Sequence, residues 1–244
     1  MNQPPATISV IIPALNEARH IGATLASLTR GQAAEIIVVD GGSSDDTVPL
    51  AQTDGAIVLS SPPGRARQQN AGAAAAGGDI LFFLHADTLV PPGYDAYIRQ
   101  ALARPGVSAG AFSLAIAGSQ PGLQLISAMA NRRSRCLQLP YGDQGLFLKA
   151  ALFHTVGGFP KLALMEDFAL VRRLRRQGPI LTLPQTVLTS SRRWQQLGLS
   201  RTFAINQLMI YGYYLGIAPT TLARLYRQAG KAPGRGRGKA GNAA

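Results

Sequence analysis

The acidic residues of this chain are few, and several of them stand where an apolar run ends. Asp40 and Asp87 each follow such a run, and Asp87 closes a His-Ala-Asp triplet. Further along, Glu166 and Asp167 stand next to each other. Carboxylates can act as oxygen ligands for hard cations or as general bases, and imidazole can bind softer metals. What these side chains do together depends on the elements that position them.

The first ninety residues alternate between apolar runs rich in β-branched residues and segments with helical periodicity. This alternation predicts an α/β fold with a parallel sheet. Such a sheet binds ligands at the carboxyl ends of its strands, so residues 13–17, 40–46 and 85–88 are expected at one edge. We expect strands at 7–13, 35–39, 56–60 and 79–84, and helices at 17–29, from about 45, and at 65–76, with Asn16 as the N-cap of the first helix.

The second half of the chain is less regular. We expect a strand over 108–116, a helix from 122 to about 133, a loop over 139–145 and a helix that begins near Met165. Acidic residues in the first turn of that last helix and four arginines in its last turn suit the helix dipole, so capping alone would explain both groups. Residues 203–217 are apolar but shorter than the roughly 20 needed to span a bilayer, so they either lie in a membrane interface or pack on the core.

The composition is typical of a globular protein inside the cell. A chain of 244 residues, 46% hydrophobic and 15% charged, is long enough for one sizeable α/β domain. The single Cys136 excludes an intramolecular disulfide and a cysteine-rich metal cluster. Residues 1–7 are polar and show no signal-peptide pattern, so we expect a cytoplasmic protein.

Basic residues gather in the last third of the chain. The net charge is +12, and Asp167 is the last acidic residue, so residues 168–244 hold 13 Lys and Arg and no acid. This asymmetry favours binding to anionic lipid, expected to weaken with salt and on removal of residues 228–244. The alternative is a solvated basic face. Nucleic acid is the competing partner of such a surface, and we do not expect it to bind.

Six motifs in order carry a resemblance to a known family. The segments 9–17 (SVIIPALNE), 37–47 (IVVDGGSSDDT), 64–72 (GRARQQNAG), 85–88 (HADT), 141–145 (YGDQG) and 166–168 (EDF) resemble family 2 glycosyltransferases with the GT-A fold. They are similar above all to a small bacterial subgroup, the selenodomain-associated or arsenosugar-pathway transferases. The resemblance covers about residues 8–195. It implies a Rossmann-like nucleotide-diphospho-sugar transferase fold, α/β, with a mostly parallel central sheet flanked by helices.

The resemblance implies that the strand ends bind a nucleotide-diphospho-sugar donor. Asp87 stands at the second acid of the family's Asp-x-Asp motif and would hold the divalent metal, Mn²⁺ or Mg²⁺, at the diphosphate. His85 would bind a softer ion or donate to phosphate, unless it is only a core residue. Position 41 is Gly, where many relatives carry a second acid. The implied donor-binding residues are Pro13, Asn16, Glu17, Asp40, Gly41, Arg65, Arg67, Asn70, His85, Ala86 and Asp87.

Most of these residues also have simpler interpretations. Glu17 would serve as a helix-start acid and Asp40 as the first residue of an Asx-turn. Arg65 and Arg67 could be solvated surface arginines, although the planar guanidinium group suits phosphate. Alternate spacing at a helix start also prevents both arginines from pointing at one ligand.

The catalytic step requires a base that takes the proton of the acceptor hydroxyl. The resemblance assigns this role to Asp167. Two adjacent carboxylates at a helix start cannot both face one atom, so Glu166 would orient substrate or hydrogen-bond locally. Asp143 and Gln144 would line the acceptor or sugar pocket, and a glycine-based turn is the alternative for Asp143. Arg193 and Trp194 resemble the end of a Gln-x-x-Arg-Trp motif, with Ser190 at the Gln position, although Trp194 could also be a core aromatic residue.

The expected protein is therefore an inverting, non-processive glycosyltransferase. We expect a catalytic domain over 1–195, a helical extension over 196–227 on the core or at a membrane, and a disordered basic tail over 228–244. The acceptor is a lipid carrier, a small metabolite or a pigment, and the sequence leaves the oligomeric state open. A dehydrogenase is excluded because Gly-x-Gly-x-x-Gly is absent after the first strand. A nucleotidyltransferase and a noncatalytic nucleotide-sugar-binding or membrane-docking module remain as alternatives.

Overall fold

The computed structural model describes residues 4–229, which form two compact units. The first unit ends at Ser191 and the second begins at Arg192. Within the described range, no helix is both long and apolar enough to cross a membrane.

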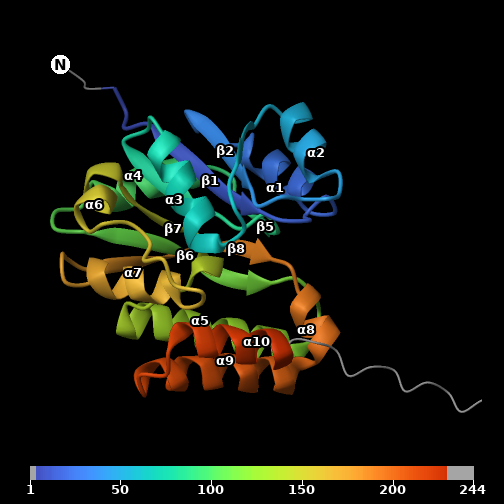
Figure 1. Ribbon diagram of the computed structural model, residues 1–244. Helices are drawn as coiled ribbons and strands as arrows, with labels where there is room; N and C mark the ends of the chain where they lie inside the picture. Colours follow the sequence, from blue (N-terminus) through green and yellow to red (C-terminus); the bar gives the residue numbers. More distant parts are fainter. Residues whose placement is uncertain (1–3, 230–244) are drawn as a thin grey trace, which may run out of the picture. The chain divides into compact units, whose positions relative to one another are not determined.

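The first unit is built on one sheet of eight strands (Figure 1). Their order is β3-β2-β1-β4-β7-β6-β8-β5. The pairs β1–β2, β2–β3, β1–β4 and β6–β8 are parallel, and the pairs that β7 makes with β4 and β6 are antiparallel, as is β5–β8. The strands are β1 Ile8–Ala14, β2 Glu35–Asp40, β3 Ile57–Ser60, β4 Ile80–Phe83, β5 Thr88–Leu89, β6 Ala109–Ile116, β7 Leu146–Lys149 and β8 Ile180–Thr189.

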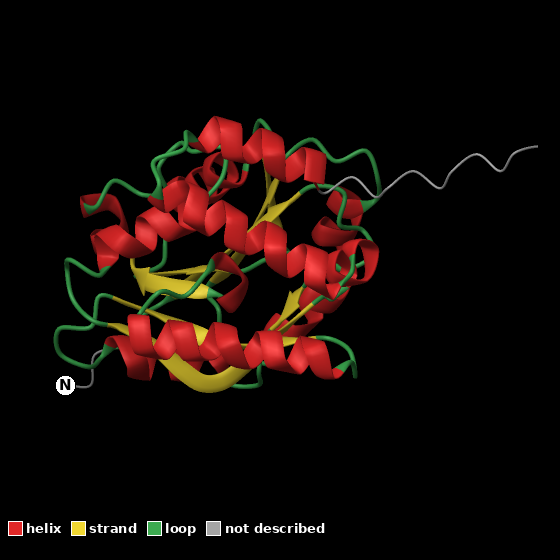
Figure 2. Ribbon diagram, turned by 90° about the horizontal axis from the view of Figure 1, so that it is seen from below, coloured by secondary structure: helices red, strands yellow, loops and turns green. Residues whose placement is uncertain are grey.

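Helices pack against this sheet on both faces (Figure 2). Phe82 and Phe83 are neighbours in β4 and so point to opposite faces. The Phe82 ring stacks on Tyr94 of α4, and the Phe83 ring meets Phe153 of α6. The helices of this unit are α1 Ile21–Leu28, α2 Thr47–Thr53, α3 Arg65–Ala75, α4 Tyr94–Leu102, α5 Pro121–Leu137, α6 Ala150–Thr155 and α7 Glu166–Leu174, with the 3₁₀ helix η1 Gly142–Gln144.

Helix α3 lies on the same face as α6. A β-carbon on Gly72 of α3 would stand 2.5 Å from the side chain of Ile11 in β1. Ile11 pairs with Phe83 in the register of β1 and β4, and paired residues point to one face. Glycine at position 72 thus lets α3 approach the sheet closely.

The structure confirms the α/β fold and corrects several element boundaries. The first helix begins at Ile21, because Glu17 to His20 form a turn in which the Glu17 carbonyl accepts from the N–H groups of His20 and Ile21. Asn16 is therefore not its N-cap. Helix α5 continues to Leu137, four residues beyond the expected end. The strands β5, β7 and β8 and the helices α4 and α6 had no counterpart among the expected elements.

The second unit consists of α8 Arg192–Leu197, α9 Leu199–Tyr214 and α10 Pro219–Ala229. Helices α9 and α10 pack where Gly212 faces Leu222, and a β-carbon on Gly212 would meet the Leu222 side chain at 2.8 Å. Gln228 and Ala229 belong to α10, so the expected tail does not begin at 228. The rest of that prediction lies outside the described residues.

Candidate functional site

Several segments that are distant in sequence reach one edge of the sheet. Strands β1, β2 and β4 run parallel, so their carboxyl ends share this edge. Helix α3 starts from the same side because it follows the end of β3, which is parallel to β2. Strand β7 runs antiparallel to β4 with Leu146 opposite Phe83, and η1 immediately precedes β7. The edge therefore receives the residues after β1, β2 and β4 together with the starts of α3 and η1.

The end of β1 is fastened to the loop after β2. The Asn16 side-chain oxygen accepts from the Ser44 N–H at 2.8 Å, and the Asn16 N–H donates to the Ser43 hydroxyl at 2.9 Å. The Glu17 N–H donates to the Thr47 hydroxyl at 2.7 Å. Asn16 has a φ of 56°, in the left-handed region that asparagine tolerates better than most residues. The predicted nucleoside-binding segments thus form one cross-linked surface.

Asp40 shapes the loop in which it stands. Its carboxylate is buried and accepts hydrogen bonds from the N–H groups of Gly42 and Ser43 at 2.9 and 3.0 Å and from the Ser43 hydroxyl at 2.5 Å. This is the turn-forming role that was the alternative for Asp40. Its contact with ribose or base stays a prediction. Pro13, also predicted to contact the donor, lies within β1 opposite Val39 and is half-buried.

Gln68 joins the ends of β1 and β2 and was not predicted as a site residue. Its buried side-chain amide donates to the carbonyls of Ala14 and Val39, both at 2.8 Å. A β-carbon on Gly41 would stand only 3.0 Å from that amide nitrogen. Glycine at position 41 therefore leaves room for Gln68, which is a physical reason for the missing second acid. The only hint in the sequence was a polar pair, Gln68 and Gln69, inside an alanine-rich helix.

The residues after β4 stand on a fixed backbone. The Ala86 carbonyl accepts from the Thr24 hydroxyl at 2.8 Å, and the Asp87 carbonyl accepts from the Ser190 N–H at 3.1 Å. Nε2 of His85 is buried and has no hydrogen-bond partner among residues 4–229. Burial lowers the pKa of His85 to about 3, and the positive charge of Arg65 adds to this effect. The imidazole is therefore uncharged at neutral pH.

The adjacent carboxylates open α7, as predicted from sequence. Met165 precedes them with a φ of 68°, an unfavourable conformation for a non-glycine residue, and such conformations gather at functional sites. Asp167 accepts from the Gly142 N–H through Oδ2 at 2.8 Å and from the Phe168 N–H through Oδ1 at 2.7 Å. Glu166 is 4% exposed. The two carboxylates thus have different surroundings, which fits different roles.

Gly142 is the point at which the end of β4 and the start of α7 meet. A β-carbon there would lie 3.2 Å from Nε2 of His85 and 3.2 Å from Oδ2 of Asp167. Both distances are shorter than ordinary van der Waals contacts of a methyl group. The imidazole and the carboxylate can therefore both approach residue 142 closely because it has no side chain.

Asp143 and Glu166 extend the same cluster. Oδ1 of Asp143 is buried and unpartnered within the described residues. Burial raises the pKa of Asp143 to about 6, with the charge of Asp167 adding to the rise and Arg133 and Arg65 opposing it. Burial and Asp167 also raise the pKa of Glu166, against the effect of Arg65, whose Nη1 lies 3.7 Å from Oε1 of Glu166. Arg65, Asp143, Glu166 and Asp167 therefore share one electrostatic environment.

Arg133 supports the turn that carries this cluster, and it was not among the residues predicted for the site. Its guanidinium carbon lies 3.4 Å from the centroid of the Tyr141 ring, and its Nε donates to the Leu139 carbonyl at 3.1 Å. Gln144, predicted to line the pocket, is fully buried and donates to the Phe112 carbonyl at 3.0 Å. The contacts of Gln144 are those of a residue that holds η1 in place.

The two arginines at the start of α3 and the following Asn70 do not converge. Arg65 pairs with Glu166 although about half of its side chain is exposed, and Arg67 is exposed too; residues two positions apart on a helix do not face each other. Asn70 donates to the Phe159 carbonyl at 2.8 Å and accepts from the Phe159 N–H at 3.0 Å. These bonds fasten α3 to the loop before α7. The predicted contact of Asn70 with the donor stays a prediction.

Arg193 and Trp194 belong to the second unit. The guanidinium carbon of Arg193 lies 3.9 Å from the centroid of the Tyr226 ring, which ties α8 to α10. Trp194 is half-buried, and its carbonyl accepts from the Gly198 N–H at 3.0 Å. A role of either residue at the acceptor remains a prediction.

The described residues contain no group of three or more His, Cys, Asp or Glu side chains arranged to hold a metal ion. A cation at this edge would therefore need ligands from the bound molecule as well as from Asp87, which is half-buried on its fixed backbone. Diphosphate oxygens and water can supply such ligands for Mg²⁺ or Mn²⁺.

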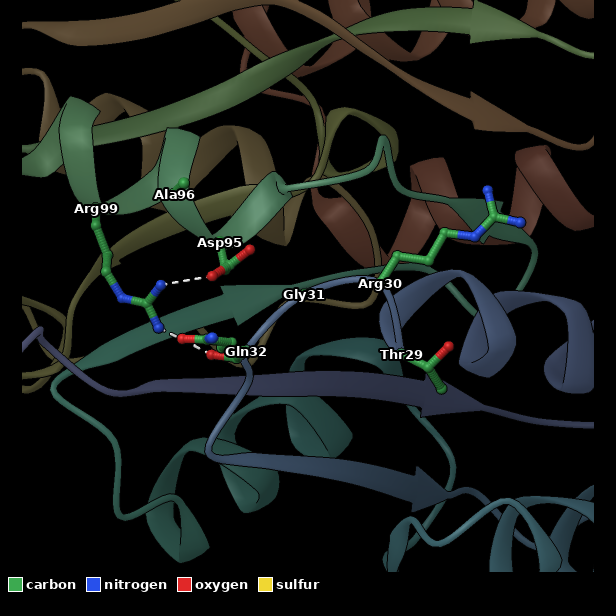
Figure 3. Close-up of a pocket in the computed structure, with 7 residues that line it drawn as sticks. All are labelled: Thr29, Arg30, Gly31, Gln32, Asp95, Ala96 and Arg99. Carbon is green, nitrogen blue, oxygen red and sulfur yellow. Dashed lines mark hydrogen bonds and ion pairs between the residues drawn. The ribbon is translucent and has the colours of Figure 1, made fainter.

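A cleft of about 600 Å³ lies elsewhere, between the α1–β2 loop and α4 (Figure 3). Arg99 donates there to Asp95 at 2.6 Å and to the carbonyls of Gln32 and Ala6, each at 2.8 Å. These carbonyls precede β2 and β1, so the cleft is at the opposite edge of the sheet. The Arg99 guanidinium group is already bonded to the residues that form the wall of this cleft. The cleft is therefore not assigned to the catalytic site.

Comparisons with known proteins agree with the geometry. A glucosyl-3-phosphoglycerate synthase from Mycobacterium tuberculosis, crystallised with Mn²⁺, UDP and glucosyl-3-phosphoglycerate, is 24% identical, with a TM-score of 0.58 over 83% of this chain and 79% of its own. A mannosyltransferase from Pyrobaculum calidifontis, in complex with GDP-Man and Mn²⁺, is 20% identical, with a TM-score of 0.62 over 92% of this chain and 69% of its own. These likenesses show the fold.

Among curated proteins, none matches the sequence. The model of the family "Glycosyl transferase family 2" matches residues 9–141, which is more than half of the chain and includes the ends of β1, β2 and β4. This match decides against the nucleotidyltransferase and the noncatalytic module considered from sequence. The protein belongs to glycosyl transferase family 2 and is a glycosyltransferase.

Proposed function

We propose that this glycosyltransferase transfers a sugar from a nucleoside diphosphate donor to an acceptor hydroxyl in single, inverting steps. The observation that carries the proposal is the convergence on Gly142, where His85 from the end of β4 and Asp167 from the start of α7 both come within 3.2 Å of one point. A group that faces the leaving diphosphate and a group that accepts a proton must stand this close, because both act on one anomeric carbon.

The donor would lie along the ends of β1, β2 and β4. Asn16, Glu17 and the loop of Asp40 would contact the nucleoside, and Arg65 would face the diphosphate. Asp87 would hold a divalent cation, Mn²⁺ or Mg²⁺, which neutralises the leaving diphosphate. A single carboxylate from the protein, that of Asp87, suffices for this cation when phosphate oxygens and water complete its coordination shell. Three of the similar structures contain Mn²⁺ or Mg²⁺ together with UDP or GDP-Man.

Asp167 would act as the general base. As the acceptor oxygen forms its bond to the anomeric carbon, the bond from that carbon to the diphosphate oxygen breaks, and the hydroxyl proton passes to Asp167. The N–H groups of Gly142 and Phe168 hold the carboxylate in one orientation while each of its oxygens keeps a lone pair. Glu166, buried beside Arg65, would orient this region and leave the proton transfer to Asp167.

The finer identity of the enzyme rests on its motifs. The segments GRARQQNAG, HADT, YGDQG and EDF are the features that resemble the selenodomain-associated or arsenosugar-pathway subgroup, and we propose that the chain belongs there. Ser190 in place of the Gln of polymerising relatives favours single transfers. The acceptor would be a lipid carrier, a small metabolite or a pigment.

We further propose that the second unit binds the surface of an anionic membrane from the cytoplasmic side. Leu208, Tyr211 and Leu215 are exposed along one face of α9 and its end, at 58%, 64% and 81%. Arg224 and Arg227 are exposed on α10, and no acidic residue follows Asp167. Exposed apolar and tyrosine side chains on α9 and exposed arginines on α10 suit the headgroup region.

A thermal-shift screen tests the donor assignment. UDP- and GDP-sugars would be added to the full chain with and without Mn²⁺, because a ligand that binds only the native state raises the apparent stability. We expect at least one nucleotide sugar to raise the melting temperature, and to do so more with Mn²⁺ than without it. A screen in which no nucleotide sugar shifts the transition under either condition would contradict the proposal.

A further inference from the structure

The cluster around Gly142 contains polar atoms that nothing in the fold satisfies. Oδ1 of Asp143 and Nε2 of His85 are buried and have no hydrogen-bond partner between residues 4 and 229. Buried polar atoms are nearly always paired, so two unpaired ones beside a single glycine indicate a place where a ligand supplies the missing partners. A carboxylate oxygen is satisfied by a hydrogen-bond donor or by a cation, and not by another acceptor.

The neighbouring carboxylates can also accept hydrogen bonds from a ligand. Each oxygen of Asp167 receives one backbone N–H and keeps a second lone pair. Glu166 is buried, and its cationic neighbour Arg65 lies at 3.7 Å with about half of its side chain exposed. The surroundings of Gly142 are therefore rich in acceptors.

The positive charges near these acceptors are already engaged. Arg133 stacks on the Tyr141 ring and donates to the Leu139 carbonyl. Arg65 pairs with Glu166. Three carboxyl groups thus share two guanidinium groups, and an additional anion placed here would meet like charge in a partly desolvated site.

We infer that the acceptor side of this site selects a molecule that presents hydroxyl or ammonium donors, and that it rejects one with a phosphate or carboxylate next to the reacting hydroxyl. The inference rests on the proposed function, in which the hydroxyl of the acceptor reaches Asp167. Asp143 acts as a specificity-determining residue that binds a group flanking that hydroxyl. Neutral polyols and amino alcohols have the right chemistry, and sugar phosphates and hydroxy acids do not.

Three small probes that differ at one position test this selection. Glycerol, 3-amino-1,2-propanediol and glycerol 3-phosphate would be compared by saturation-transfer NMR on the full chain, with Mg²⁺ and saturating UDP and GDP present to fill the diphosphate side. We expect the amino alcohol and glycerol to be saturated about tenfold more than the phosphate, the size of effect that one charged hydrogen bond supplies. The signals of the nucleotide bases report separately on donor binding.

Asp143→Asn should reduce the preference for the amino alcohol about tenfold, because it removes a charge and one acceptor oxygen. Asp54→Asn makes the same change of charge at an exposed residue at the end of α2 and should leave the preference unaltered. Equal or stronger saturation of glycerol 3-phosphate, no saturation of any probe, or an unchanged preference in Asp143→Asn overturns the inference. Loss of the nucleotide signals alone would instead contradict the proposed function.

Discussion

His85 and Asp167 both approach Gly142, with Nε2 of one and Oδ2 of the other each 3.2 Å from the point that a β-carbon on residue 142 would occupy. The two residues are separated by more than eighty positions in the chain, and they arrive from β4 and from α7. The Gly142 N–H donates to Asp167, so the same residue leaves room for the carboxylate and fixes its direction.

Gly142→Ala should therefore damage function more than stability. The added methyl group would displace His85 and Asp167 by a few tenths of an ångström, and catalysis is sensitive to small displacements of reacting groups. We expect sugar transfer to fall by about tenfold or more, and the melting temperature to change little, measured on the purified variant.

Gly22→Ala is the matched control, because its β-carbon would meet only Oδ2 of Asp54 at an ordinary 3.6 Å. Alanine within α1 should be neutral or stabilising, by up to about 1 kcal/mol. Equal activity of Gly142→Ala and Gly22→Ala would show that the approach at Gly142 has no role in the reaction.

Asp143 should make the stability of the protein depend on pH, with a higher free energy of unfolding in mild acid than at alkaline pH. Burial raises its pKa to about 6 from 3.8, so the folded state binds the proton more readily than the unfolded state. The contribution is present in full below about pH 4 and is lost as the pH rises through 6. Asp143→Asn removes the charge, and we expect it to be more stable than wild type at pH 8 by up to about 3 kcal/mol, with the difference vanishing near pH 4.

Urea unfolding at pH 4, 6 and 8 measures this effect. Asp54→Asn, at an exposed carboxylate, should track the wild type at every pH. A variant Asp143→Asn that is less stable than wild type at pH 8 would mean that the ionised Asp143 has a stabilising partner.

Gln68 should contribute to stability and to donor binding together. Its amide bridges the Ala14 and Val39 carbonyls at the ends of β1 and β2, and Gln68→Ala leaves both without that donor. We expect a loss of about 1–3 kcal/mol in the free energy of unfolding, and weaker binding of the nucleotide sugar. Gln52→Ala, on the exposed face of α2, should change neither. Unchanged affinity for the nucleotide sugar in Gln68→Ala would show that the hydrogen bonds of Gln68 do not shape the surface that binds the donor.

The second unit should bind vesicles that contain phosphatidylglycerol and not vesicles of phosphatidylcholine alone. Co-sedimentation should decrease as salt is raised from 50 to 300 mM, concentrations chosen because roughly 0.1 M salt already shortens the screening length to about 10 Å. Replacing Leu208 and Leu215 with serine should weaken binding further, since both side chains are exposed. Equal sedimentation with the two kinds of vesicle would contradict the electrostatic attraction.

The strand ends were predictable from sequence because each follows a buried apolar run and carries a loop with polar residues. Asp40, His85 and Glu166-Asp167 were all placed correctly at the ends of elements for this reason. The motif order supplied the family, and the family model confirms it. The local sequence pattern is sufficient to predict a strand or helix end where neighbouring residues in the chain determine it.

The contacts across the edge were not predictable, because they depend on tertiary packing. Nothing in the sequence near Gln68 indicates that its amide bridges two strand ends, and Arg133 lies in a helix that was expected to end there. Strand β7 was not predicted, because it has only four residues and is followed directly by α6, so no turn signal marks its end. The close approach at Gly142 joins residues whose separation in sequence gives no periodic signal.

The most direct measurement compares transfer and donor binding in Asp167→Asn. With the nucleotide sugar found by thermal shift, we expect the rate of sugar transfer to fall by about a hundredfold to ten-thousandfold, the usual contribution of a general base, while donor affinity with Mn²⁺ changes less than threefold. Asn keeps the size of the side chain and one oxygen to accept from Gly142. A variant that transfers sugar at the wild-type rate would contradict the assignment of Asp167 and with it the account of the site at Gly142.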